Sequence, residues 1–125
     1  MITTFLQVGL GGAIGAMLRF GAGLGVARLH GGSFPLAVMS VNVLGSVLMG
    51  VLFIWSMERG MGHLNPLLMT GILGGFTTFS AFSLDAFVLW DKGLPGQAAA
   101  YVALSVALSI GGLALGVWLA RGVLT

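Results

Sequence analysis

Four long apolar stretches, separated by three short polar clusters, make up almost all of this 125-residue chain. The clusters are rich in glycine, proline and charged residues, which end helices, and they occupy residues 28–33, 58–66 and 91–97. The apolar stretches between them lie at about residues 4–27, 34–57, 64–90 and 97–120. A helix that crosses a membrane needs about 20 mainly apolar residues. We therefore predict an all-α membrane protein, with one domain of four transmembrane helices over residues 1–125.

Composition excludes several classes of function. Hydrophobic residues make up 58% of the chain and charged residues 6%, whereas soluble domains have about 25% charged residues. The five basic residues are too few and too scattered to indicate nucleic-acid binding. Both histidines fall in predicted loops, and no nucleophile with a neighbouring base is evident, so we expect no enzyme. Cysteine is absent, which excludes disulfides and thiolate metal sites.

Basic residues, which normally set the orientation of a membrane protein, are nearly balanced between the two sides. With four spans, Arg59 and Arg121 share a side with both termini, and Arg28 and Lys92 lie on the other. Arg19, if it reaches outward from the first span, adds only a slight bias. This balance favours insertion in both orientations and pairing as an antiparallel dimer. A weakly biased protein that inserts one way is the alternative.

Small residues recur four positions apart in the spans, a pattern that lets helix backbones approach closely in lipid. The pairs are Gly11 with Gly15, Gly12 with Ala16, Ser46 with Gly50, and Gly112 with Gly116. Packing within one chain and contact between subunits both explain this pattern.

Polar side chains inside the spans are candidates for function, because each is costly in lipid unless it faces protein or water. Asn42 in the second span offers amide donors and an acceptor, although a lone asparagine can also simply join two helices. Tyr101, Ser105 and Ser109 are spaced four residues apart and therefore place three hydroxyls on one helix face. Local bonding of serine to its own helix is the alternative for this stripe.

The third span contains two glycines and two threonines near its midpoint, which predicts a break at residues 74–78. Carbonyls freed by such a break form a site for a bare cation, whereas a continuous helix with glycines at a crossing point forms none. Phe79 and Phe82 follow on one face, where they either pack or line an anion path with their positive ring edges. Asp85 is either a charge at the rim of the span or a partner for Arg19.

Three sequence strings resemble the Fluc (CrcB) fluoride channels, a family of small four-helix membrane proteins. They are Gly11-Gly-Ala-Ile-Gly-Ala-Met-Leu-Arg-Phe20, Val41-Asn-Val-Leu-Gly-Ser46 and, most specifically, Gly74-Gly-Phe-Thr-Thr-Phe-Ser-Ala-Phe82. The resemblance covers essentially the whole chain. It implies an antiparallel, dual-topology homodimer in a bacterial cell (inner) membrane, with two fluoride pores and a structural sodium ion (Na+) on the two-fold axis.

The resemblance also implies roles for individual residues. The sodium ligands would be the backbone carbonyls of Gly74 and Thr77 from both subunits. The residues that match the family's pore are Asn42, Phe79, Phe82, Tyr101, Ser105 and Ser109. The chain departs from the common family pattern at Phe20, Ala81 and Asp85.

These observations predict a channel that exports fluoride passively and so lowers its cytoplasmic concentration. The alternative is a proton-coupled exporter of the small multidrug-resistance type, which needs a carboxylate in its first span; this chain has none there. A membrane scaffold protein is a third class, but it leaves the polar groups inside the spans without a purpose.

Overall fold

The computed structural model describes residues 1–32 and 34–124, and the elements within these ranges are helical. In chain order they are α1 (Ile2–Leu29), α2 (Leu36–Glu58), the 3₁₀-helix η1 (Gly62–Leu64), the π-helix η2 (Pro66–Leu73), α3 (Gly74–Phe76), α4 (Phe79–Asp91) and α5 (Pro95–Leu124).

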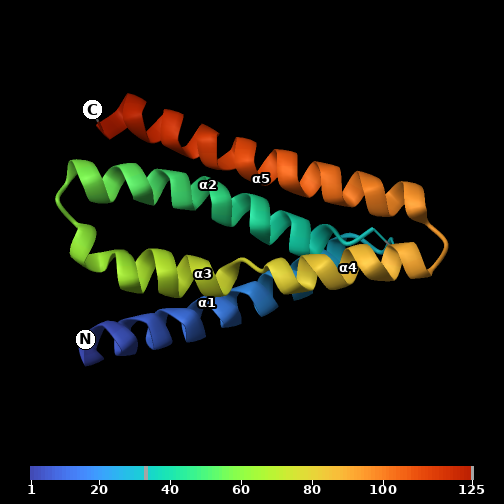
Figure 1. Ribbon diagram of the computed structural model, residues 1–125, viewed down its shortest axis with the longest axis horizontal. Coiled ribbons are helices and arrows are strands. Elements are labelled where there is room, and N and C mark those ends of the chain that lie inside the picture. The colour runs from blue at the N-terminus through green and yellow to red at the C-terminus, as the bar shows by residue number, and fades with distance from the viewer. Residues whose placement is uncertain (33, 125) are drawn as a thin grey trace.

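The helices run roughly along the long axis of the molecule, and the N and C labels lie at the same end of the bundle (Figure 1). Four helical stretches are long and apolar enough to cross a membrane, which confirms the prediction of four apolar helices. In the most apolar part of each stretch, between 11% and 28% is buried inside the chain. The remaining apolar surface faces outward, as it must where the solvent is lipid. The chain is thus an all-α integral membrane protein.

The third stretch, Gly62–Asp91, consists of η1, η2, α3 and α4 in succession. The prediction for this span did not include its π-helical part. Here the N–H of Gly74 donates to the carbonyls of both Gly71 and Met69, the latter a wide π-type bond. The link between α3 and α4 is visible in Figure 1 as a thin segment near the middle of the bundle.

Tight turns join the spans at both ends of the bundle. Gly60 follows α2 with φ of 63°, and Gly93 follows α4 with φ of 77°. Both lie in the left-handed region that glycine enters without a steric penalty. Short turns of this kind make successive spans antiparallel neighbours.

Glycines set the closest helix contacts, and these contacts lie within one chain. A Cβ atom at Gly15 would overlap the Ile72 carbonyl of η2, and one at Gly71 would lie 2.9 Å from the Gly11 Cα. On the other side of the bundle, a Cβ at Gly116 of α5 would overlap the Val47 carbonyl of α2. The pairs Gly11 with Gly15 and Gly112 with Gly116 therefore contribute to packing inside the chain, the first alternative given for that pattern.

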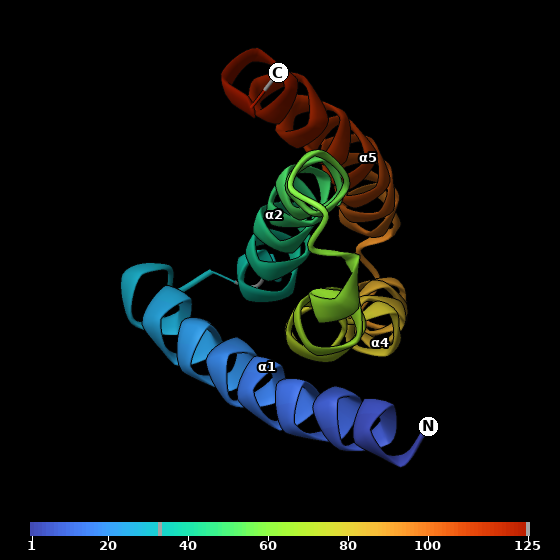
Figure 2. The same ribbon diagram turned by 90° about the vertical axis from the view of Figure 1, so that its left-hand side faces the viewer.

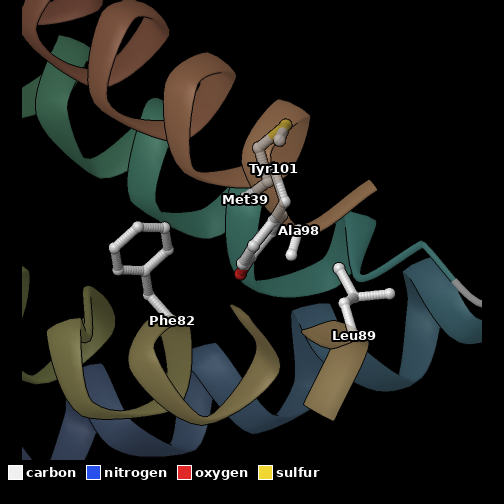
Figure 3. Close-up of a cluster of buried hydrophobic side chains, with 5 residues drawn as sticks. All are labelled: Met39, Phe82, Leu89, Ala98 and Tyr101. Carbon is white, nitrogen blue, oxygen red and sulfur yellow. The ribbon is translucent and has the colours of Figure 1, made fainter. Parts of the chain in front are cut away.

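These glycine contacts join the helices in two pairs. α1 lies against η2 and α3, whereas α2 lies against α5. In the end view of Figure 2, α1 crosses the bundle obliquely and lies apart from α5. A cluster of buried side chains joins α2, α4 and α5 near the α4–α5 turn (Figure 3). Its members are Met39, Phe82, Leu89, Ala98 and Tyr101.

Candidate ion pathway

The link between α3 and α4 consists of two threonines with extended backbone. Thr77 has φ, ψ of −92°, 158° and Thr78 has −153°, 126°, so neither continues a helix. Thr78 then caps α4, because its Oγ1 accepts a hydrogen bond from the Ala81 N–H at 3.1 Å. Threonine is a preferred residue at this position of a helix.

Asn42 of α2 binds the backbone of this link with both ends of its amide. Its Nδ2 donates to the Thr78 carbonyl at 2.9 Å, and its Oδ1 accepts from the Thr78 N–H at 2.7 Å. Unpaired backbone groups are costly at membrane depth. The asparagine therefore satisfies the two backbone groups of Thr78 across the helix–helix contact.

Carbonyl oxygens at the link have the chemistry of a cation site. In a continuous α-helix, the Thr78 N–H would donate to the Gly74 carbonyl and the Ala81 N–H to the Thr77 carbonyl. Both N–H groups donate to side chains instead. Neutral carbonyl oxygens released at an interrupted helix are suitable ligands for Na+. The donor set at Gly74 and Thr77 thus fits the ion that the resemblance implies.

A pocket of about 490 Å³ lies beside the link, between α2, α4 and α5. Its lining is Asn42, Gly45, Ser46, Met49, Thr77, Thr78, Phe79, Phe82, Ser105, Val106, Ser109, Ile110 and Leu113. None of these lining residues carries a charge. Hydroxyl and amide groups supply the polar atoms, so this part of the chain offers hydrogen bonds to an ion without a fixed counter-charge.

Of the three hydroxyls on one face of α5, two line the pocket and the third lies outside it. Ser105 and Ser109 line the pocket, and the Ser105 Oγ is buried with no hydrogen-bond partner among the described residues. Tyr101 lies outside the lining, fully buried, and its hydroxyl donates to Oδ2 of Asp85 at 3.2 Å. A buried hydroxyl without a partner is rare in proteins.

Aromatic rings continue from the pocket toward Tyr101. The rings of Phe79 and Phe82 are 5.3 Å apart, and those of Phe82 and Tyr101 are also 5.3 Å apart. Phe82 is 7% exposed, whereas Phe79 is 77% exposed. Figure 3 shows Phe82 and Tyr101 in the buried cluster at this end of the path. One ring is therefore fixed by its neighbours and the other projects from the chain.

The structure brings most of the predicted pore residues to one pocket. These are Asn42, Phe79, Phe82, Ser105 and Ser109, with Thr77 from the predicted cation site beside them. Gly74 and Tyr101 lie outside the lining. Sequence reasoning did not propose Ser46 or Thr78 as lining residues. Ser46 follows Asn42 by four positions, so the same spacing rule that grouped the α5 hydroxyls would have found it.

Two charged residues within the spans have separate partners. The Nε of Arg19 donates to the Gly75 carbonyl at 3.2 Å. Asp85 accepts from Tyr101 instead. The structure therefore pairs Asp85 with Tyr101 and Arg19 with Gly75, and it does not support Asp85 as a partner for Arg19.

Comparison with known proteins places the chain among relatives that match it along nearly its whole length. The profile of the family described as "CrcB-like protein, Camphor Resistance (CrcB)" matches residues 6–117. A protein from Ruegeria sp. (strain TM1040) named "Fluoride-specific ion channel FluC" is 56% identical over 126 residues, covering 100% of both chains. The Roseobacter denitrificans protein of that name is also 56% identical, over 96% of this chain and 97% of its own length. A third, from Cereibacter sphaeroides, is 55% identical over 98% of both. This chain belongs to the CrcB-like family.

Proposed function

We propose that this protein is a fluoride channel of the cell membrane. The observation that carries this proposal is the uncharged pocket between α2, α4 and α5, whose polar atoms are hydroxyls and an amide beside two phenylalanine rings. The names of the relatives identify the ion as fluoride. Because family membership covers the spans that form the pocket, this function extends to the present chain.

The pocket offers fluoride several weak sites in place of its hydration shell. The partnerless Ser105 hydroxyl, together with Ser109 and the second N–H of the Asn42 amide, supplies donors. A hydrogen bond to a charged group contributes about 1.5–3 kcal/mol, so a few in succession offset much of the dehydration cost. The positive edges of Phe79 and Phe82 add attraction without a fixed charge that would trap the ion. Such a path is passive, and it exports fluoride whenever the cytoplasmic concentration is the higher one.

We infer that the working unit is an antiparallel homodimer. Phe79 lines the pocket and yet is 77% exposed, so the single chain leaves one wall of the path open. The near balance of Lys and Arg between the two sides favours chains inserted both ways up. A second, inverted copy would cover the open wall and form a second path related by a two-fold axis. In a bacterium, this assembly belongs in the inner membrane.

A structural sodium ion completes the proposed assembly. The Gly74 and Thr77 carbonyls of two copies would give it four oxygen ligands across the two-fold axis. Their release from helical hydrogen bonding supports this assignment. Bound there, the ion would supply positive charge to hold two interrupted helices together.

Fluoride efflux from liposomes that contain only the purified protein tests the channel itself. We expect rapid efflux, recorded with a fluoride electrode, that needs no proton gradient. Efflux no faster than from empty liposomes would exclude a channel. Efflux that stops when the proton gradient is removed would favour a small multidrug-resistance-type exporter, for which α1 lacks the necessary carboxylate.

Reporters fused after the last residue, which lies outside the described ranges, test dual topology. We expect roughly equal signals from the two sides of the membrane, because the basic residues favour neither side. Two or three lysines added beside Glu58 should then fix one orientation and lower fluoride transport. A reporter signal from one side alone in the unmodified protein would contradict the antiparallel dimer.

A further inference from the structure

The carbonyls around the link between α3 and α4 are not equally available. The Leu73 carbonyl accepts from both the N–H and the Oγ1 of Thr77, at 3.0 and 2.9 Å. The Gly75 carbonyl accepts from Arg19 and the Thr78 carbonyl from Asn42. The two carbonyls whose helical donors are diverted, those of Gly74 and Thr77, lie between these covered ones. Side-chain contacts therefore help to determine which of these oxygens remain open.

Two side chains perform the diversion. The Thr78 N–H, which would return to Gly74 in a continuous helix, is held by the Asn42 Oδ1 at 2.7 Å. The Ala81 N–H, which would return to Thr77, is held by the Thr78 Oγ1 at 3.1 Å. Each acceptor competes directly with one carbonyl. Without them, the low-cost alternative in lipid is to restore the two helical bonds. Each restored bond would use one of the two lone pairs of its carbonyl and so make that oxygen a poorer cation ligand.

We propose that Asn42 and Thr78 are positioning residues for a monovalent cation, because they keep the Gly74 and Thr77 carbonyls free of their helical donors. This inference rests on the proposed sodium site and adds the residues that prepare it. Asn42 thereby has two roles. One N–H and the Oδ1 bond the Thr78 backbone, and the second N–H can donate a hydrogen bond into the pocket.

Substitutions that remove or retain each acceptor test this inference, although a change at Asn42 also removes the Nδ2 donor to the Thr78 carbonyl. Thr78→Val removes the oxygen at nearly constant shape, and Thr78→Ser retains it. Asn42→Leu removes the other acceptor. Ser83→Ala is the matched control, because Ser83 Oγ donates to the carbonyl of Phe79, one turn earlier in α4, and diverts no backbone N–H.

The measurement is the thermal unfolding midpoint of each purified variant as sodium replaces N-methyl-D-glucamine at constant ionic strength. A ligand that binds the folded state raises this midpoint by mass action. We expect Thr78→Val and Asn42→Leu to need at least about tenfold more sodium than the unmodified protein for the same rise. Thr78→Ser and Ser83→Ala should remain within about threefold of it.

The outcomes separate this inference from the proposed channel function. An unmodified protein indifferent to sodium, or a Thr78→Val variant that responds like it, would overturn the positioning role even if fluoride efflux were normal. If the valine and leucine variants do not fold, Thr78→Ser decides: a sodium requirement more than about tenfold higher contradicts the inference, and an unchanged one supports it. Failure of fluoride efflux with the sodium pattern intact would refute the channel and leave the positioning role standing.

Discussion

The two halves of the third span pack against their neighbours in different ways. The first half, η2 and α3, lies against α1 so closely that backbone meets backbone at Gly11, Gly15, Gly71 and Gly75. The second half, α4, presents aromatic side chains toward α2, α5 and the pocket. Close backbone packing is how helices associate in lipid, where hydrophobic burial offers no net drive. The comparison indicates that backbone contacts fix the first half of the span and side-chain contacts fix the second half.

The largest effect that distinguishes the halves should come from Phe82→Ile in α4. Isoleucine retains apolar bulk, so loss of stability should remain below about 1.5 kcal/mol. The ring edge is lost, and we expect fluoride efflux to fall at least about 100-fold, since each 1.4 kcal/mol on a barrier is about tenfold in rate. Phe79→Ile should behave in the same way. Normal efflux from a folded isoleucine variant would show that the rings only fill space.

The next effect, on stability, should come from Gly71→Ala in η2. Its new Cβ would meet the Gly11 Cα at 2.9 Å and the Pro66 carbonyl at 3.1 Å, and backbone atoms cannot rotate away. We expect a loss of about 1–3 kcal/mol, measured as unfolding in detergent. Gly9→Ala is the control, since nothing lies within 4 Å of its Cβ, and it should gain up to about 1 kcal/mol from helix propensity. Equal stability of the two variants would mean that α1 is not held by this contact.

The smallest effect should come from Ser105→Ala in the pocket, and it should separate transport from stability most clearly. The buried Oγ has no partner among the described residues, so its removal should leave stability within about 0.5 kcal/mol of the unmodified protein or raise it slightly. Fluoride efflux should fall about tenfold, because one hydrogen bond to the passing ion is lost. A large loss of stability with unchanged efflux would assign the hydroxyl to packing instead of the path.

Sequence patterns predicted the four spans because length and apolar content suffice for a helix in lipid. Spacing of four residues also placed Ser105 and Ser109 together on the pocket side of α5. Each of these features depends on the residues of a single span, which is why the sequence predicts them. The roles predicted for the pore residues and the sodium ligands remain predictions that the efflux and sodium experiments address.

Features that involve two spans were harder to predict. The hydrogen bonds from Asn42 reach a residue 36 positions later, so their existence depends on how α2 crosses the third span. The π-helix was missed because an almost uniformly apolar span has no polar face from which a change of period can be read. Whether the small residues pack within the chain likewise became clear only with the helices in place.

The π-helix also bears on how members of this family can gain or lose residues. A π-helical segment lets a helix absorb an extra residue while the turns on either side of it stay regular. Deleting one residue from Pro66–Leu73 would restore an ordinary α-helix, but it would turn everything before the deletion by about 100° relative to α3. The surface of η2 that meets Gly11 and Gly15 would then point elsewhere. A relative with a one-residue gap at this place should therefore carry compensating changes in its first span, shifted by one position.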